Sequence, residues 1–148
     1  MDPAAIPISA AEYVCVDTET TGRPGDDCEL TEVGAVLVGG GELHERFESL
    51  VRVERPLSRG IERFTGITQQ MVDEAPPPQE VLLRLKELAA DRILVAHSAS
   101  FDRRVLAQAF ERAGIEWVEP PILCTVAMAR RFAPLARQRK LAPLAEAL

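Results

Sequence analysis

The stretch Tyr-Val-Cys-Val-Asp-Thr-Glu-Thr-Thr-Gly, residues 13–22, decides how the rest of the chain is interpreted. Its first four residues are apolar or aromatic and a polar turn follows, as expected for a strand buried on both faces in the middle of a sheet. Asp17 and Glu19 come at the end of this strand. Because residues two apart in a strand project to the same face, both carboxylates are expected to point at one spot.

Two adjacent carboxylates repel each other, and each raises the pKa of the other unless a cation lies between them. Oxygen ligands suit a hard divalent ion such as Mg²⁺ or Mn²⁺. On its own, the pair could also do no more than cap a turn, so the other parts of the sequence decide its meaning.

The composition bounds the class of protein. The 148 residues, 47% of them hydrophobic, suffice for one globular domain with a proper core but not for two. No apolar run approaches the length of a membrane span, and the first 11 residues lack the features of a signal peptide. A soluble, cytoplasmic protein with no membrane partner is expected. The cysteines have no metal-ligand spacing and are predicted to be free, buried thiols: Cys15, Cys28 and Cys124.

The formal net charge is −6, so no overall positive field attracts nucleic acid. The charge is unevenly distributed, because residues 125–140 carry five basic side chains and no acid, which leaves −11 for the rest. This stretch is either a solvated helix face or an edge that contacts phosphates. Its basic residues are Arg130, Arg131, Arg137, Arg139 and Lys140.

The sequence predicts a flexible N-terminal arm over residues 1–11 and a single domain over residues 12–148. Residues 23–28 have turn composition. Runs at 30–38 and 43–53, separated by three glycines, predict a hairpin, which makes the sheet mixed. Glu32 in the first run could face the carboxylate pair or solvent.

Residues 56–78 predict a long connection with short helical turns. In it Gly66 can take a positive φ, and Thr68 can cap a turn at 69–74. The next helix places three apolar residues at helical spacing to cover the sheet, namely Val81, Leu85 and Leu88.

Residues 93–96 form a second short apolar run, which leads through a polar turn into an amphipathic helix. Phe101, Val105 and Ala109 share one face of that helix, and Gly114 is placed to end it. Further on, residues 122–124 read as a strand and 125–133 as a helix. The last helix, from residue 141, has no terminal cap, and we expect the sequence to be a fragment.

Asp102 falls in the first turn of the amphipathic helix, with Ser100 expected as its N-cap. Decoration of a helix end would also explain this Asp. In an α/β domain, however, ligands gather at the carboxyl ends of parallel strands, where Asp17, Glu19 and Asp102 would converge. Such a cluster suits two divalent ions about 3.5–4 Å apart and predicts phosphodiester hydrolysis by a metal-activated water.

Five motifs in order carry a family resemblance: DTETTG at 17–22, EVGAV at 32–36, TGIT at 65–68, AHSASFD at 96–102, and CT at 124–125 with ARR at 129–131. Together they resemble the DEDD superfamily of 3′–5′ exonucleases. The likeness is strongest to the proofreading exonuclease of bacterial DNA polymerase III, as a separate epsilon subunit or as a domain of Gram-positive replicative polymerases.

The resemblance implies an α/β, RNase H-like fold with a mixed five-stranded sheet flanked by helices. It also implies two Mg²⁺ or Mn²⁺ ions, with Asp17 bridging both, Glu19 binding one and Asp102 supporting the other through its waters. The resemblance also implies the substrate-binding residues. Thr20, Thr21 and Gly22 would hold the terminal nucleotide, Phe101 would lie behind Asp102, and Thr65 would be a further substrate-binding residue.

The sequence departs from the family pattern in two places. Ser98 stands where the family usually has Asn, which shortens the reach of a hydrogen bond in the turn. More seriously, the third motif, a His followed five residues later by an Asp after the helix at 141, is absent, because no histidine follows His97. His97 itself is expected to orient its turn. The domain is therefore expected to be incomplete, with its C-terminal part truncated and its activity crippled.

The leading prediction is a metal-dependent 3′–5′ exonuclease acting on single-stranded or frayed DNA 3′ ends, with a DNA polymerase subunit as a possible partner. An exoribonuclease of the same superfamily is the alternative within this chemistry. A noncatalytic docking module with a nuclease fold is the alternative outside it. A nucleotide-binding α/β protein is disfavoured, because the chain has no glycine-rich phosphate loop.

Overall fold

A computed structural model describes residues 2–22 and 28–148. The described chain forms one five-stranded sheet in the order β3-β2-β1-β4-β5. Strands β1 (Glu12–Thr20), β4 (Ile93–Ala96) and β5 (Ile122–Cys124) are parallel, whereas β2 (Leu30–Gly39) and β3 (Glu42–Leu50) form an antiparallel hairpin beside β1. The predicted mixed sheet is confirmed.

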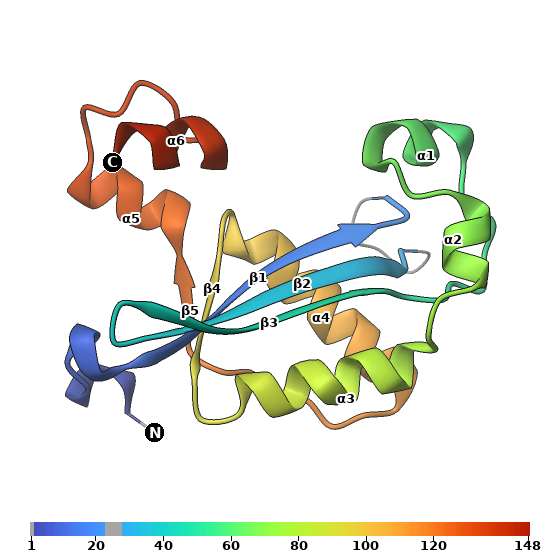
Figure 1. The fold of residues 1–148 in the computed structure, drawn as a ribbon, viewed down its shortest axis with the longest axis horizontal. Coiled ribbons are helices and arrows are strands. Elements are labelled where there is room, and N and C mark those ends of the chain that lie inside the picture. Colours follow the sequence, from blue (N-terminus) through green and yellow to red (C-terminus); the bar gives the residue numbers. More distant parts are fainter. Residues whose placement is uncertain (1, 23–27) are drawn as a thin grey trace.

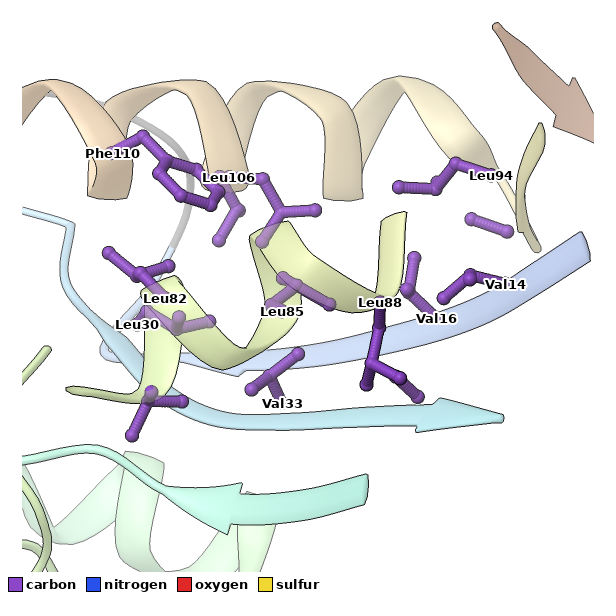
Figure 2. Packing of buried hydrophobic residues seen from close by; sticks show 14 of the residues in the cluster. Val14, Val16, Leu30, Val33, Leu82, Leu85, Leu88, Leu94, Leu106 and Phe110 are labelled. Atoms are coloured by element: carbon purple, nitrogen blue, oxygen red, sulfur yellow. The ribbon is translucent and has the colours of Figure 1, made fainter. Parts of the chain in front are cut away.

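Helices α3 (Pro78–Ala89) and α4 (Ala99–Ala113) cover one face of the sheet (Figure 1). Alternate residues of β1 point into this layer, and Val14 and Val16 are buried there. Leu82, Leu85 and Leu88 of α3 lie between the strands and α4, as Figure 2 shows. Because side chains alternate along a strand, Asp17 and Glu19 belong to the opposite face.

The hairpin turn is formed by Gly40 and Gly41, which have φ values of 61° and 81°. Positive φ at both central residues is the geometry that matches the twist of two antiparallel strands, and glycine adopts it without steric cost. The predicted second hairpin strand, residues 43–53, ends earlier, at Leu50, because the chain leaves the sheet there for the long connection.

That connection contains α1 (Arg59–Thr65) and α2 (Gln69–Asp73), as predicted. Gly66 ends α1 with φ 76°, and the Thr68 side chain accepts a hydrogen bond from the Met71 N–H at the start of α2. Val53, Ile67 and Val72 form a small second core below these turns.

Beyond β5 the chain continues as α5 (Thr125–Phe132) and α6 (Leu141–Ala147), which lie past the carboxyl end of β5 (Figure 1). At the other end of the chain, two 3₁₀ turns, η1 (Pro3–Ala5) and η2 (Ile8–Ala10), precede β1, and the flexibility expected of this arm stays a prediction. No helix of the described residues is long and apolar enough to cross a membrane. The predicted turn at 23–28 falls almost entirely outside the described residues.

Three details of the sequence analysis were wrong. The N-cap of α4 is Ser98, in a left-handed conformation, and Ser100 lies inside the helix. Strand β1 is buried on one face only, because Tyr13 and Cys15 on its other face are half-buried, so the expected burial on both faces is not observed. The cysteines are free, but only Cys28 is buried; Cys15 and Cys124 are half-buried.

Candidate active site

Strand β1 extends past its neighbour β4. The pairing of the two strands covers Tyr13, Val14 and Cys15, so the residues from Val16 onward have ladder partners on β2 alone. This overhang presents Asp17, which is exposed, and Glu19, which is half-buried, on one face. The predicted side-by-side placement of the two carboxylates follows directly from the regular strand geometry.

Asp102 reaches the same end of the sheet from the first turn of α4, and its residue exposure is only 3%. Its carboxylate accepts a hydrogen bond of 2.8 Å from the Thr18 hydroxyl. Thr18 lies between the two β1 carboxylates and points to the opposite face, toward α4. Its role was not predicted, because a threonine in a strand carries no signal of a partner 84 positions away.

The carboxylates form one electrostatic cluster. Burial raises the pKa of Glu19, and the negative charges of Asp17, Glu32 and Asp102 raise it further. Burial also raises the pKa of Asp102, while the Thr18 hydrogen bond opposes this effect and the charge of Asp17 adds to it. Interacting charges of one sign are the property expected of groups that share a cation.

Glu32 belongs to this cluster. It pairs with Glu19 across β1 and β2, so the two side chains share a face and are neighbours. Burial raises the pKa of Glu32, with contributions from Glu48 and then Asp17. Glu48 pairs with Gly34 on the next strand, which in turn lies opposite Asp17. Of the two orientations considered for Glu32, the one facing the carboxylate pair is therefore observed.

The donor set fits a hard divalent cation, because it offers only carboxylate oxygens and no thiolate or imidazole. In the described part of the chain, however, no three His, Cys, Asp or Glu side chains approach closely enough to hold one ion. The Asp102 carboxylate is directed to Thr18 instead of to Asp17. Repulsion between the Asp102 and Asp17 carboxylates favours their separation, and a cation bound by both would remove that repulsion.

The turn after β1 is held by its own side chains. The Thr20 hydroxyl donates to the carbonyl of Gly22, and the Thr21 hydroxyl accepts from the Glu29 N–H at 2.9 Å. These bonds fix the backbone next to the carboxylates, as a loop that holds a ligand requires. The part that Thr20, Thr21 and Gly22 play in substrate binding stays a prediction.

The other two predicted substrate residues lie on helices. The Thr65 hydroxyl donates to the Ile61 carbonyl at 2.8 Å and accepts from the Ile67 N–H, so it stabilises the end of α1. Phe101 is partly exposed beside Asp102 and is available to contact a ligand.

His97 connects two elements. Its Nδ1 lies 2.9 Å from the Thr125 hydroxyl, which joins the end of β4 to the start of α5. This contact is what the expected role in orienting the turn requires.

Comparison with known proteins adds to this geometry. The exonuclease family model RNase_T matches residues 14–148. The chain belongs to this exonuclease family. The predicted membership of the DEDD exonuclease superfamily is thereby confirmed, together with its likeness to DNA polymerase III relatives.

Among curated proteins, this exonuclease chain is 40% identical over 129 residues to the PolC-type DNA polymerase III of Bacillus cereus, covering 87% of the chain and 9% of the polymerase. It is 42% identical over 143 residues to a putative bifunctional exonuclease/endonuclease of Mycobacterium tuberculosis, covering 89% of the chain and 22% of that protein. The chain thus spans less than a quarter of the length of either relative.

Two solved structures are similar to the exonuclease chain. Exonuclease X in complex with 5′ overhanging duplex DNA superposes with a TM-score of 0.66 and 31% identity, over 82% of this chain and 64% of that one. Exonuclease I of E. coli in complex with a dA16 oligonucleotide gives a TM-score of 0.75 over 86% of this chain and 30% of that one. At 16% identity, the second likeness shows the fold alone.

Proposed function

We propose that this domain hydrolyses phosphodiester bonds at the 3′ end of single-stranded or frayed DNA, with two Mg²⁺ or Mn²⁺ ions as cofactors. The observation that carries the proposal is the placement of Asp17 and Glu19 on the unpaired end of β1, with Asp102 held at the same end of the sheet by its hydrogen bond to Thr18. When bound, the ions stabilise charge on the attacking and leaving oxygens of the displaced phosphate.

Each protein group has a distinct part in this proposal. Asp17 and Glu19, on the overhang of β1, would hold the ions directly. Thr18 would fix the position of Asp102, which would support the second ion. The turn at Thr20 would receive the terminal nucleotide. A related protein supports the choice of DNA, because the Exonuclease X structure contains it, and PolC-type relatives support a polymerase as partner.

The proposal includes an expectation about rate. The family's general base belongs to a third motif that these 148 residues do not contain, since no histidine follows His97. We therefore expect them to bind metal ions well but to hydrolyse DNA slowly. The docking-module alternative is weaker, because a pure scaffold has no use for three coupled carboxylates. The exoribonuclease alternative differs only in the tolerance of a 2′-hydroxyl.

Calorimetric titration of the protein with Mn²⁺ tests the metal site. We expect binding that is lost in Asp17→Asn and retained in Glu111→Gln, a matched control that removes an exposed carboxylate from α4. Hydrolysis is followed in parallel on a single strand labelled at its 5′ end, in DNA and RNA versions. Stepwise shortening of DNA supports the proposal even if it is slow. Absence of Mn²⁺ binding would favour the docking module, and faster shortening of RNA the exoribonuclease.

A further inference from the structure

Residues 125–140, the basic segment, concentrate five positive charges that the carboxylate site does not use. All five basic side chains are exposed, and within the described residues none makes an ion pair. Some arginines elsewhere do pair with glutamates: Arg84 with Glu45 and Glu87, Arg92 with Glu12, and Arg103 with Glu119. The charge of the basic segment is therefore available to a partner.

The basic segment begins beside the carboxylate site. Thr125, the first residue of α5, is hydrogen-bonded to His97. Ser98, which follows His97 in the sequence, is the N-cap of the helix that carries Asp102. Figure 1 shows α5 and α6 beyond the end of the sheet where β4 and β5 finish. A polymer chain with one end at the carboxylates could thus continue along the basic segment.

The side chains of this segment match the chemistry of a single-stranded nucleic acid. Phe132 is 73% exposed, and the Arg131 guanidinium lies 5.6 Å from the centre of its ring. An exposed aromatic ring next to arginine is suited to stack on a base while the cation contacts a phosphate. At a rise of about 1.5 Å per residue, Arg130 lies about 8 Å along α5 from Thr125.

We propose that the basic segment binds the phosphate backbone of the single strand whose 3′ end occupies the carboxylate site. This inference rests on the proposed function and adds the route of the substrate. The need for such a surface follows from the charge, because the rest of the chain carries −11 and repels DNA. Local cations that are not neutralised by acids offset that repulsion where the strand passes.

Fluorescence anisotropy with a labelled oligothymidylate of about 12 nucleotides, in EDTA over a series of salt concentrations, tests the proposal without any contribution from metal ions. In the double variant Arg130→Gln/Arg131→Gln we expect the affinity at low salt to fall by more than about tenfold. The slope of log K against log salt should become shallower by about 1.4, at about 0.7 per lost charge on a single strand. Phe132→Ala should weaken binding without changing the slope.

The control variant is Arg84→Gln/Lys86→Gln. It removes the same amount of positive charge from α3, a helix distant in sequence from the basic segment, and should leave the slope of log K against log salt unchanged. Equal losses in both double variants would mean that only net charge matters and would overturn the proposal. Unchanged affinity in Arg130→Gln/Arg131→Gln, or no binding by the unmodified protein, would identify the segment as a solvated surface and would also overturn it. Mn²⁺ calorimetry remains a separate test of the carboxylates, so failure of one proposal is distinguishable from failure of the other.

Discussion

The hydroxyl of Thr18 and the carboxylate of Asp102, 84 positions apart in the sequence, are joined by a buried hydrogen bond of 2.8 Å. This bond connects the central strand to the first turn of α4 and aims Asp102 at the end of the sheet. It also provides partial compensation for a carboxylate that has lost most of its water.

Replacing Thr18 with Val keeps the shape of the side chain and removes this bond. We expect the free energy of unfolding at neutral pH to fall by about 1.5–3 kcal/mol, the usual contribution of a hydrogen bond to a charged group. The pKa of Asp102 should rise further, because the hydroxyl holds it down. Urea denaturation and an NMR titration measure the two effects. Thr18→Ser, which keeps the hydroxyl, is the control, and a Thr18→Val protein as stable as the unmodified one would contradict the prediction.

The raised pKa values predict how stability depends on pH in the absence of metal. Glu19, Glu32 and Asp102 all titrate above their ordinary values in the folded protein, so the folded state binds protons more tightly than the unfolded one. Their contribution to stability is therefore complete below about pH 4, the usual range of carboxyl groups. It is lost as the pH rises through the raised values.

Asp17→Asn tests this pH dependence, because the charge of Asp17 raises all three pKa values. Thermal denaturation in EDTA between pH 4 and 7 should show a shallower decline in stability for this variant. At pH 7 it should be more stable than the unmodified protein, by at most about 1 kcal/mol, since partly exposed charges are screened. Parallel curves for the variant and the unmodified protein would show that the carboxylates do not interact.

Helix α3 offers a matched pair for testing the core. Leu85 is fully buried under the sheet and Leu83, on the same helix, is 51% exposed. Leu85→Ala should lower the free energy of unfolding by about 2–5 kcal/mol through lost burial and a cavity. Leu83→Ala should change it by no more than about 0.5 kcal/mol. Chemical denaturation of both variants measures the difference, and similar losses would show that α3 packs in another orientation.

The glycine turn of the hairpin makes a further prediction. Gly41 has φ 81°, so Gly41→Ala should destabilise the protein by about 1–2 kcal/mol through strain alone, since no atom lies near the added methyl group. Gly60→Ala, inside α1, should instead stabilise it by about 0.5–1 kcal/mol. Melting temperatures of the two variants should therefore move in opposite directions, and shifts of the same sign would refute the assigned turn.

Local patterns were enough to predict most of the fold. The apolar runs ending at Val16 and Ala96 indicated two parallel strands, and they are adjacent in the sheet. The glycines at 39–41 indicated the hairpin, and Gly114 the end of α4. These features succeed because strand alternation, turn chemistry and helix caps act over a few residues.

What escaped prediction depends on contacts distant in sequence. The register that places Glu32 opposite Glu19 comes from the pairing of two strands, and sequence alone left two orientations open. Thr18 acquires its partner only when α4 packs on the sheet.

The one-sided pairing of β1 beyond Cys15 has a consequence for motion. Backbone amides at Val14 are held within three neighbouring strands, whereas those from Val16 onward have a ladder on the β2 side only. Local opening at this end of the strand then costs less free energy than opening the centre of the sheet. The segment that carries Asp17 and Glu19 is therefore expected to open more readily than the strand centre around Val14. Hydrogen exchange should accordingly be slow at Val14 and faster along the overhang.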